Sequence, residues 1–446
     1  MADLRPQAKR RPSNARTRFE TACSSFLAFC LLFLAGWSHG HAKVFDPTQF
    51  RLNNGLQVVV IENHRVPAAV QMLWYKVGAA DEARGESGVA HVLEHLMFKG
   101  TDDVPGKEFS SFVRRYGGRE NAFTSWDYTA YYQVVPVDQL GQVMAFEAGR
   151  MRGLALEPEE IASERSVVLE EWNERIAQNP SAKLGIELAA ALYRNHNYGR
   201  PIIGWRHELK GLDRETVLNF YQRYYAPDNA ILVVAGDVTP DDVKKLAEEH
   251  YGSIPPSNNP PEAGTVEPPP RAERRVILQD ERVADPSWRR SYLAPSRGTE
   301  GSEHVLALEV LAEILGDSSV GRLAKNLVRG SEQATYASIY YDGDRRGPTS
   351  FSIYAAPRRD VSMENLEKAI EDEIRALLRD GVSEEEVTST VKRLRAAAVY
   401  ARDDLETAAR VLGRTLAIGG TVKQVETWPE RLESVTAEDV VEAAES

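Results

Sequence analysis

A proline-rich, polar segment divides the chain into two parts, and this division constrains the fold most. Residues 255–270 read PPSNNPPEAGTVEPPP, which has the apolar period of neither a strand nor a helix. Once residues 1–42 are set aside, the blocks on either side hold about 215 and about 175 residues, which are ordinary domain sizes. We predict an N-terminal domain over 43–254, a linker over 255–271 and a C-terminal domain over 272–446.

The two blocks repeat one order of elements at an offset of about 215 residues. The first opens with apolar segments at 57–61 and 70–77, then a turn and a helix from Ser87. The second opens with 275–278 and 290–293, then a similar turn and helix. Mixed strands and amphipathic helices favour an α+β fold, with antiparallel sheets covered by helices, over a strict alternation of parallel strands and helices.

The second block ends before the pattern of the first is complete. In the first block a helix over 215–225 precedes a strand over 230–234 and a helix over 241–251. In the second block the equivalent helix covers 437–444, and no counterpart of the last strand and helix follows in the sequence. We therefore expect the C-terminal domain to be a duplicate of the first that is truncated at its end.

The first 42 residues differ from the rest of the chain. Six Lys and Arg residues precede an apolar run at 22–37, and small residues, Gly40 and Ala42, flank His41. This order is typical of a secretory signal peptide, and the apolar run is short for a membrane span. We predict export to the periplasm with cleavage after Ala42; an uncleaved segment that anchors the chain in the membrane is the alternative.

Composition excludes several classes of function. A net charge of −12 argues against nucleic acid as a partner. The two cysteines, Cys23 and Cys30, both lie in the predicted signal peptide. A processed chain therefore has neither a disulfide nor a catalytic thiol.

The segment SGVAHVLEHLMFKG, residues 87–100, predicts a helix with two different faces. Ser87 suits the N-cap and Gly100 the position just beyond the last turn. One face is an apolar stripe formed by Val89, Leu93, Leu96 and Met97. The other face carries His91, Glu94 and His95.

Histidines at positions i and i+4 of a helix project side by side, so His91 and His95 can bind one metal ion. Glu94, on the same face, can reach a water molecule at that ion without binding the metal. Catalytic zinc needs a third protein ligand and one open position. A second predicted helix, which begins at Pro158, offers carboxylates for this role. The candidates are Glu160, Glu164, Glu170, Glu171 and Glu174, and helical spacing alone leaves the choice open.

The order H-x-x-E-H is the signature of the inverzincins. Over residues 45–446 the chain resembles the pitrilysin/insulinase-type zinc metallopeptidases, particularly their bacterial half-length and processing-peptidase-like members. Further segments that carry the resemblance are NAFT at 121–124, ERSVVLEE at 164–171, YGRPIIG at 198–204 and YAPDNA at 225–230.

The resemblance implies roles for particular residues. The family's spacing places the third zinc ligand on Glu171, beside His91 and His95, and a supporting acid on Glu164. Glu94 is then the catalytic base. The resemblance also implies that Arg329 and Tyr336, seven residues apart in the second domain, hold the substrate carbonyl and stabilise the oxyanion.

A substrate site is implied as well. Asn121, Ala122, Phe123 and Thr124 correspond to an edge strand to which a peptide adds as an extra strand. The family's fold is two duplicated domains that form half of a clamshell around a chamber, which admits unfolded peptides. We expect one Zn²⁺ per chain, and either a homodimer or a heterodimer with a related subunit.

The predicted function is zinc-dependent hydrolysis of peptide bonds in unfolded peptides or small polypeptides. One alternative is a non-catalytic or regulatory subunit of a two-subunit peptidase of the same family. A second alternative is a zinc-dependent module that captures peptides without cleaving them.

Overall fold

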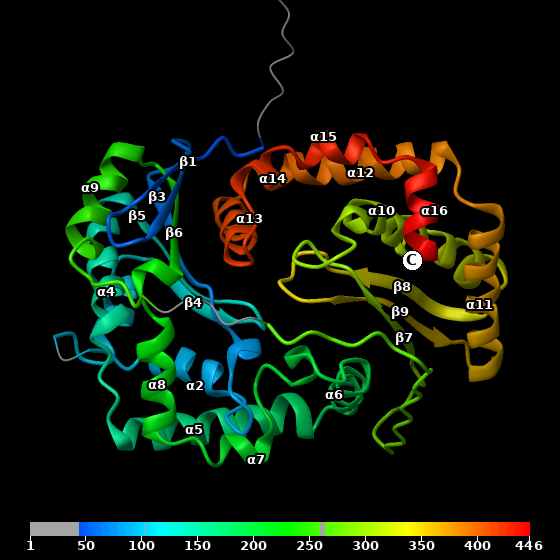
Figure 1. Ribbon diagram of the computed structural model, residues 1–446, viewed down its shortest axis with the longest axis horizontal. Helices are drawn as coiled ribbons and strands as arrows, with labels where there is room; N and C mark the ends of the chain where they lie inside the picture. Colours follow the sequence, from blue (N-terminus) through cyan, green and yellow to red (C-terminus); the bar gives the residue numbers. More distant parts are fainter. Residues whose placement is uncertain (1–43, 102, 259–263) are drawn as a thin grey trace, which may run out of the picture. The chain divides into compact units, whose positions relative to one another are not determined.

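The computed structural model describes residues 44–101, 103–258 and 264–446, and two β-sheets organise this part of the chain (Figure 1). The predicted signal peptide lies outside the described residues. Helices pack on both sheets, and all neighbouring strands but one pair are antiparallel. The α+β class is therefore confirmed.

The first sheet has six strands in the order β1-β2-β6-β3-β5-β4. The strands are β1 (Thr48–Arg51), β2 (Gln57–Glu62), β3 (Ala68–Tyr75), β4 (Arg119–Thr124), β5 (Thr129–Pro136) and β6 (Ala230–Gly236). The exceptional pair is β2 and β6, which run parallel. All seven residues of β6, AILVVAG, are buried. A strand that is apolar throughout is stable only when both faces of its sheet are covered.

Eight α-helices belong to the described residues of this half. They are α2 (Val89–Leu96), α3 (Glu108–Arg115), α4 (Leu140–Arg152), α5 (Pro158–Trp172), α6 (Pro180–Leu192), α7 (Arg206–Leu209), α8 (Arg214–Tyr224) and α9 (Pro240–Tyr251). On one face of the sheet, Leu73 and Leu232 share a buried cluster with Leu93 of α2, Val217 of α8 and Val243 of α9. This core fixes α2, the helix with the histidine pair, against the sheet.

The second sheet has three antiparallel strands in the order β7-β9-β8. They are β7 (Trp288–Ala294), β8 (Ala334–Tyr341) and β9 (Thr349–Pro357). The helices of this half are α10 (Val305–Gly316), α11 (Met363–Asp380), α12 (Glu384–Ala401), α13 (Leu405–Ala417), α14 (Val422–Glu426), α15 (Trp428–Glu433) and α16 (Ala437–Glu445). Their order repeats that of the first half, with α10 in the place of α2 and α16 in the place of α8.

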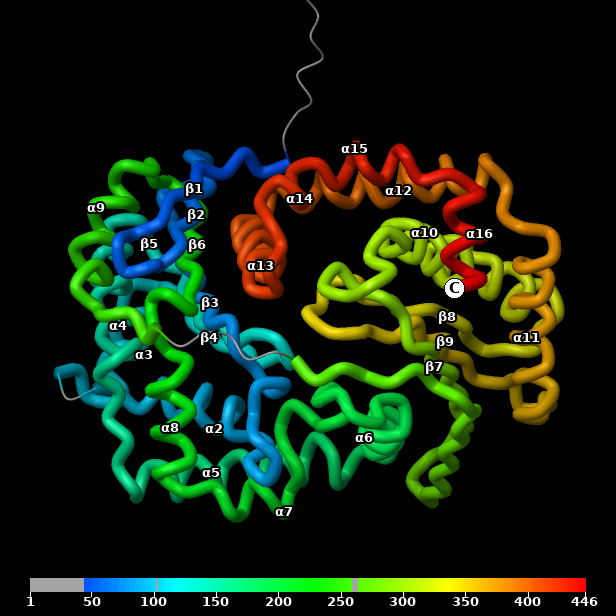
Figure 2. Tube along the Cα trace, in the orientation of Figure 1, coloured from blue at the N-terminus to red at the C-terminus, as the bar shows by residue number. Residues whose placement is uncertain are grey.

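Helix α13 belongs to the second half by sequence but packs on the first sheet (Figures 1 and 2). Ala409 and Leu412 share a buried cluster with Trp74 and Val233. The approach is close, because a Cβ on Gly413 would lie 2.1 Å from Nε1 of Trp74. The face of the first sheet opposite α2 is therefore covered by a helix from the other half.

The loop between β8 and β9 also contacts the first half. Arg346 forms ion pairs with Asp127 at 3.1 Å and with Asp81 at 2.7 Å. The hydroxyl of Tyr198 donates to both carboxylate oxygens of Asp127, at 2.5 and 2.7 Å, and accepts the backbone N–H of Gly347 at 3.0 Å. Asp127 is only 1% exposed. Its contacts with Arg346 and Tyr198 offset the free-energy cost of removing this carboxylate from water.

Two local predictions were wrong. Residues 275–278 do not form a strand, because no neighbouring strand in the described part of the chain offers them a hydrogen-bonding partner. The histidine helix begins after Gly88 and ends at Leu96, so it is shorter at both ends than the predicted span between Ser87 and Gly100. Gly88 has a φ of 93°, which sets the chain direction into the helix and which residues other than glycine rarely adopt.

The domain boundaries at 43–254, 255–271 and 272–446 stay predictions, because contacts such as those of α13 cross them. Among the described residues, no helix combines the length and the apolar character that crossing a lipid bilayer requires.

Candidate metal centre

The N-terminus of α2 is held by a buried carboxylate. Glu82 accepts the backbone N–H groups of Gly88 and Ala90, each at 3.0 Å. These are N–H groups that a helix start leaves without intrahelical partners. Burial raises the pKa of Glu82 to about 8, although both hydrogen bonds and the charge of Arg200 act in the opposite direction. Glu82 therefore fixes the start of α2 in position. Because Glu82 titrates near pH 8, the stability of this contact depends on pH.

His91, His95 and Glu171 converge on one point. Oε2 of Glu171 lies 3.4 Å from Nε2 of His95 and 3.8 Å from Nε2 of His91. The three ligand atoms, one from each residue, all lie within 4.8 Å of one another. Ligands of tetrahedral zinc, at about 2.0–2.1 Å from the metal, are about 3.3 Å apart. The spacing around Glu171 is close to that value.

The donor atoms suit a divalent cation. Oε2 of Glu171 is buried and makes no hydrogen bond within the described structure. Burial lowers the pKa of His91 to about 4, so its imidazole is neutral at pH 7 and keeps a lone pair for a metal. The contact with His95, above all, lowers the pKa of Glu171. Two imidazoles and a carboxylate form a zinc-binding set known from metallopeptidases, so the residues fit the ion.

Three charged contacts surround the candidate ligands. Glu164 lies about two turns before Glu171 on the same face of α5, and its Oε2 lies 3.3 Å from Nδ1 of His95. Its other oxygen accepts Nζ of Lys99 at 2.5 Å. Arg175 lies 2.8 Å from Oε1 of Glu171. Carboxylates that hold the second nitrogen of a ligand histidine fix its tautomer and ring orientation.

His95 differs from His91 in its electrostatics. Burial on its own would lower the pKa of His95, but the close contact with Glu171 and the charge of that carboxylate, with smaller contributions from Glu94 and Glu164, outweigh burial and raise the pKa. Without a metal, His95 therefore attracts a proton to the centre of the cluster. A bound cation would take the place of that proton.

Glu94 lies between the two histidines in sequence and contacts the edge of the sheet. The hydroxyl of Thr124, at the end of β4, donates to Oε2 of Glu94 at 2.5 Å. Burial raises the pKa of Glu94, and the Thr124 hydrogen bond partly offsets this effect. A carboxylate with a raised pKa is a better proton acceptor near neutral pH than an exposed one.

Strand β4 is an edge of the first sheet and carries Asn121, Ala122, Phe123 and Thr124. It pairs with β5 on one side. On the other side, no strand of the described chain pairs with it, so alternate backbone N–H and C=O groups can bind an added strand. Thr124 joins this edge directly to Glu94. The structure thus brings the predicted edge strand and the predicted base together.

Arg329 and Tyr336 lie elsewhere. Arg329 is exposed in a π-helical turn, Ala324–Gly330. Tyr336 lies on β8 and is 46% exposed. Neither makes a hydrogen bond or ion pair with the histidine cluster in the part of the chain described. Their roles stay predictions.

Several contacts at the centre were missed by the sequence interpretation. Lys99 and Arg175 each follow a site residue by four positions, His95 and Glu171, and this helical spacing was a usable signal. Glu82 had no such signal, and neither had the contact of Thr124 with Glu94, although Thr124 itself was predicted as part of the substrate edge, because each reaches α2 from a separate segment.

Comparison with known proteins places the chain in a family. Residues 57–205 match the model described as Insulinase (Peptidase family M16), and residues 211–394 match the model described as Peptidase M16 inactive domain. A zinc protease from Helicobacter pylori, PqqE, is 31% identical over 336 residues, which cover 74% of each chain. An uncharacterised zinc protease of Mycobacterium tuberculosis is 29% identical over 408 residues, 90% of each chain.

Solved structures share the fold. A protease from Helicobacter pylori matches with a TM-score of 0.83 and 26% identity, over 90% of this chain and 96% of that one. Pitrilysin matches with a TM-score of 0.71 and 17% identity over 92% of this chain, but only 44% of its own length is covered. The half-clamshell fold of these peptidases is therefore the fold of this protein.

The fold, the H-x-x-E-H helix and these similarities agree, and the chain belongs to the pitrilysin/insulinase family of M16 peptidases, as a half-length member.

Proposed function

We propose that the protein is a zinc-dependent endopeptidase that hydrolyses extended, unfolded peptides. The observation that carries the proposal is the convergence of His91, His95 and Glu171, with ligand atoms within 4.8 Å of one another, beside the buried carboxylate of Glu94. One ion per chain is expected, because the described residues contain one cluster of this kind. Relatives named zinc proteases support the choice of metal.

His91 and His95 would hold zinc through Nε2, and Glu171 through Oε2. Zinc at such a site lowers the pKa of a water molecule towards neutrality and polarises a peptide carbonyl. Glu164 and Lys99 hold His95 in the ring orientation that presents Nε2 to the ion.

Glu94 would move the protons. Oε2 of Glu94 accepts the hydrogen bond of Thr124. The other oxygen, Oε1, can therefore accept a proton from the attacking water. The same carboxyl then donates that proton to the nitrogen of the leaving amine. Because burial raises the pKa of Glu94, the carboxylate takes up the proton of the attacking water in the first step more readily than it would with an ordinary pKa.

Strand β4 would bind the substrate. A peptide that pairs with the edge at Asn121–Thr124 lies beside Glu94, because Thr124 contacts both. Main-chain pairing selects an extended backbone and tolerates many side chains. This recognition mode fits unfolded peptides rather than folded proteins.

The roles proposed for Arg329 and Tyr336, stabilisation of the oxyanion, rest on the family resemblance. The half-length of the chain relative to pitrilysin and to the periplasmic protease PqqL of Escherichia coli, of which it covers 44% and 46%, supports assembly with a second half-length chain. We also propose export, because the N-terminal segment has the pattern of a signal peptide and PqqL is described as periplasmic.

Zinc content and turnover of an internally quenched peptide test the proposal together. The wild-type chain should contain about one zinc ion and cleave the peptide. Glu94→Gln should keep the zinc and lose cleavage. Zinc without cleavage in the wild type would favour the peptide-capturing module or the non-catalytic subunit. Absence of zinc from a chain purified without chelators would refute the metal assignment.

A mixing experiment tests where Tyr336 acts. Glu94→Gln and Tyr336→Phe should each be inactive alone. If two chains build one site, mixing the two variants restores part of the activity. If Tyr336→Phe is fully active, the proposed role of Tyr336 is wrong.

A further inference from the structure

The residues of β4 alternate between the two faces of the first sheet. Phe123 pairs with Ala130 of β5, and both belong to the cluster that α13 covers. Ala122 packs on the opposite face, in the cluster that holds α2. Thr124 contacts Glu94 on that same face. A strand that adds to β4 would therefore point alternate side chains towards the proposed zinc site and towards α13.

Helix α13, from the second half of the chain, contacts β4 through charged side chains. Arg119, at the start of β4, forms an ion pair with Glu406 of α13. About one turn further along α13, the guanidinium of Arg410 lies 4.5 Å from the ring centre of Phe123 and 5.6 Å from that of Tyr132. Both distances are within the range of a cation–π contact, about 6 Å. The second half thus places a cation beside the proposed substrate edge.

Arg410 differs from the next arginine of α13 in its partners. Arg414 is held by an ion pair with Asp342. For Arg410, the contacts with the two aromatic rings are the only ones found, and no carboxylate of the described residues forms an ion pair with it. The charge of Arg410 is therefore available to a carboxylate from another molecule.

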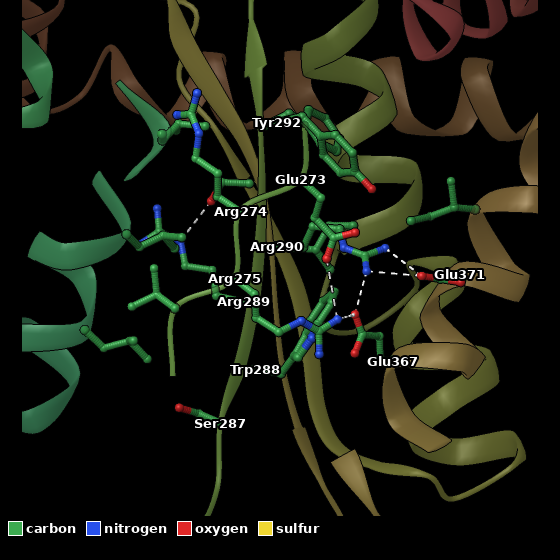
Figure 3. A pocket seen from close by; sticks show the side chains of 18 of the residues that line it. Glu273, Arg274, Arg275, Ser287, Trp288, Arg289, Arg290, Tyr292, Glu367 and Glu371 are labelled. Atoms are coloured by element: carbon green, nitrogen blue, oxygen red, sulfur yellow. Dashed lines mark hydrogen bonds and ion pairs between the residues drawn. The ribbon is translucent and has the colours of Figure 1, made fainter. Parts of the chain in front are cut away.

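Arginines in the second half show how such a charge is usually balanced. A groove of about 1980 Å³ beside β7 is lined in part by Arg275 and Arg290 (Figure 3). Both contact Glu367 at 2.7 Å, and Arg290 also contacts Glu371 at 3.1 Å. An acidic ligand would have to displace these carboxylates, whereas at Arg410 it would meet no such competitor.

The stacked position prepares Arg410 for a carboxylate. The side chain is half-buried, and its guanidinium stands over the rings of Phe123 and Tyr132. A planar guanidinium that contacts a ring keeps N–H groups at its edge, and these match the two oxygens of a carboxylate. If Arg410 only covered the aromatic surface, as the stems of long cationic side chains often do, substrate charge would have no effect.

A peptide on β4 would bring one side chain to Arg410. Residues directly opposite each other on paired strands have Cβ atoms about 4.5–5.5 Å apart and share a face of the sheet. The substrate residue opposite Phe123 would therefore lie on the α13 face, where the guanidinium of Arg410 covers the Phe123 ring. The residues before and after it would face α2 and Glu94.

We propose that Arg410 is a specificity-determining residue that favours peptides with Asp or Glu at the position paired with Phe123. The inference rests on the proposed function, because it requires a substrate that adds to β4. The acidic side chain would form an ion pair with the edge of the guanidinium on the α13 face. The same peptide would keep its neighbouring residues directed at the proposed zinc site on the other face.

The test uses the full chain, loaded with zinc, and a mixture of unfolded peptides of random sequence. Mass spectrometry of the products identifies the cleaved bonds. At one position, counted from the cleaved bond, Asp and Glu should be enriched at least about threefold in the peptides that the wild type cleaves. The two positions beside it should show no such enrichment, because their side chains face α2.

Three substitutions of Arg410 localise the preference. Arg410→Glu should replace the acidic preference with a basic one at the same position. Arg410→Gln should remove the preference and still cleave neutral peptides, and Arg410→Lys should keep an acidic preference. The matched control is Arg379→Glu, which makes the same charge change at an exposed residue of α11, a helix that packs on β9. This control should retain the wild-type preference.

The outcomes separate this inference from the proposed function. Cleavage by the wild type without acidic enrichment would overturn the role of Arg410 and leave the peptidase assignment intact. The same acidic enrichment in Arg410→Gln as in the wild type would also overturn it. If the zinc-loaded wild type cleaves none of the peptides, the proposed function fails, and the role of Arg410 fails with it.

Discussion

Thr124 donates a hydrogen bond of 2.5 Å to Glu94, so the last residue of the edge strand contacts the carboxylate between the two histidines. In the proposed mechanism, substrate binding and proton transfer are linked through this one hydroxyl. A peptide that adds to β4 would change the surroundings of Thr124 and, through it, those of the base.

Replacement of Thr124 by valine removes this donor with little change in volume. Because the hydrogen bond lowers the pKa of Glu94, its loss should raise that pKa. The acidic limb of kcat/KM against pH should then move up by roughly half to one pH unit. Thr124→Ser keeps the hydroxyl and should restore the wild-type profile. An unshifted limb in Thr124→Val would show that the contact does not tune Glu94.

Carboxylates on α5 should separate into three classes of zinc affinity. Glu171→Gln should lose most of the bound zinc, because it removes a charged ligand. Glu164→Gln should lower the affinity for zinc by about 10–100-fold, because it weakens the contact that orients the His95 ring. Glu170→Gln is the matched control and should bind zinc normally. Competition with a chelator of known affinity measures all three, and equal affinities of the Glu171 and Glu170 variants would contradict the assignment.

Glu82 should make the metal-free protein less stable in alkali. Its folded pKa, about 8, lies above the ordinary value of 4.5. Its contribution to stability is therefore complete below pH 4.5 and is lost as pH rises through 8. Glu82→Gln removes this dependence. From pH 5 to pH 9 the variant should gain roughly 3–5 kcal/mol in unfolding free energy relative to the wild type.

Urea unfolding in the presence of a chelator measures this difference without interference from zinc. Glu86→Gln, four residues along the same loop, is the control and should follow the wild type. If the difference in unfolding free energy between Glu82→Gln and the wild type is the same at pH 5 and pH 9, Glu82 does not titrate between these pH values.

Two glycine-to-alanine substitutions should have opposite effects on stability. Gly413→Ala adds a methyl group 2.1 Å from Trp74 and should cost about 1–3 kcal/mol through overpacking. Gly149→Ala, in α4, meets no atom within 4 Å and should stabilise the protein by about 0.5–1 kcal/mol. Urea unfolding of the two variants checks both values. If Gly413→Ala is neutral, α13 does not pack as closely as described.

Sequence patterns were sufficient where one segment determines its own structure. The continuous apolar run at 230–234 predicted β6, and Pro158 predicted the first turn of α5, where the structure has it. The histidine pair predicted a metal cluster because its geometry is local to one helix. Helical spacing left five carboxylates open for the third ligand, and family resemblance was needed to select Glu171.

Patterns failed where a distant segment decides the outcome. Residues 275–278 are apolar enough for a strand but have no strand to pair with. The contact of Thr124 with Glu94 joins segments 30 residues apart, and no local period encodes it. The placement of α13 on Trp74 depends on the meeting of two halves, which an amphipathic pattern alone does not specify.

The crossing of α13 limits how the protein can be divided. Every residue of the proposed zinc site comes from the first half of the sequence, which suggests a catalytic module that could be expressed on its own. Cleavage in the proline-rich segment would instead leave Trp74, Met72 and Val233 facing water, and the excised half would aggregate rather than fold. All residues of the proposed metal site thus come from the first half of the chain, but that half needs α13 of the second half to keep its sheet buried and to stay soluble.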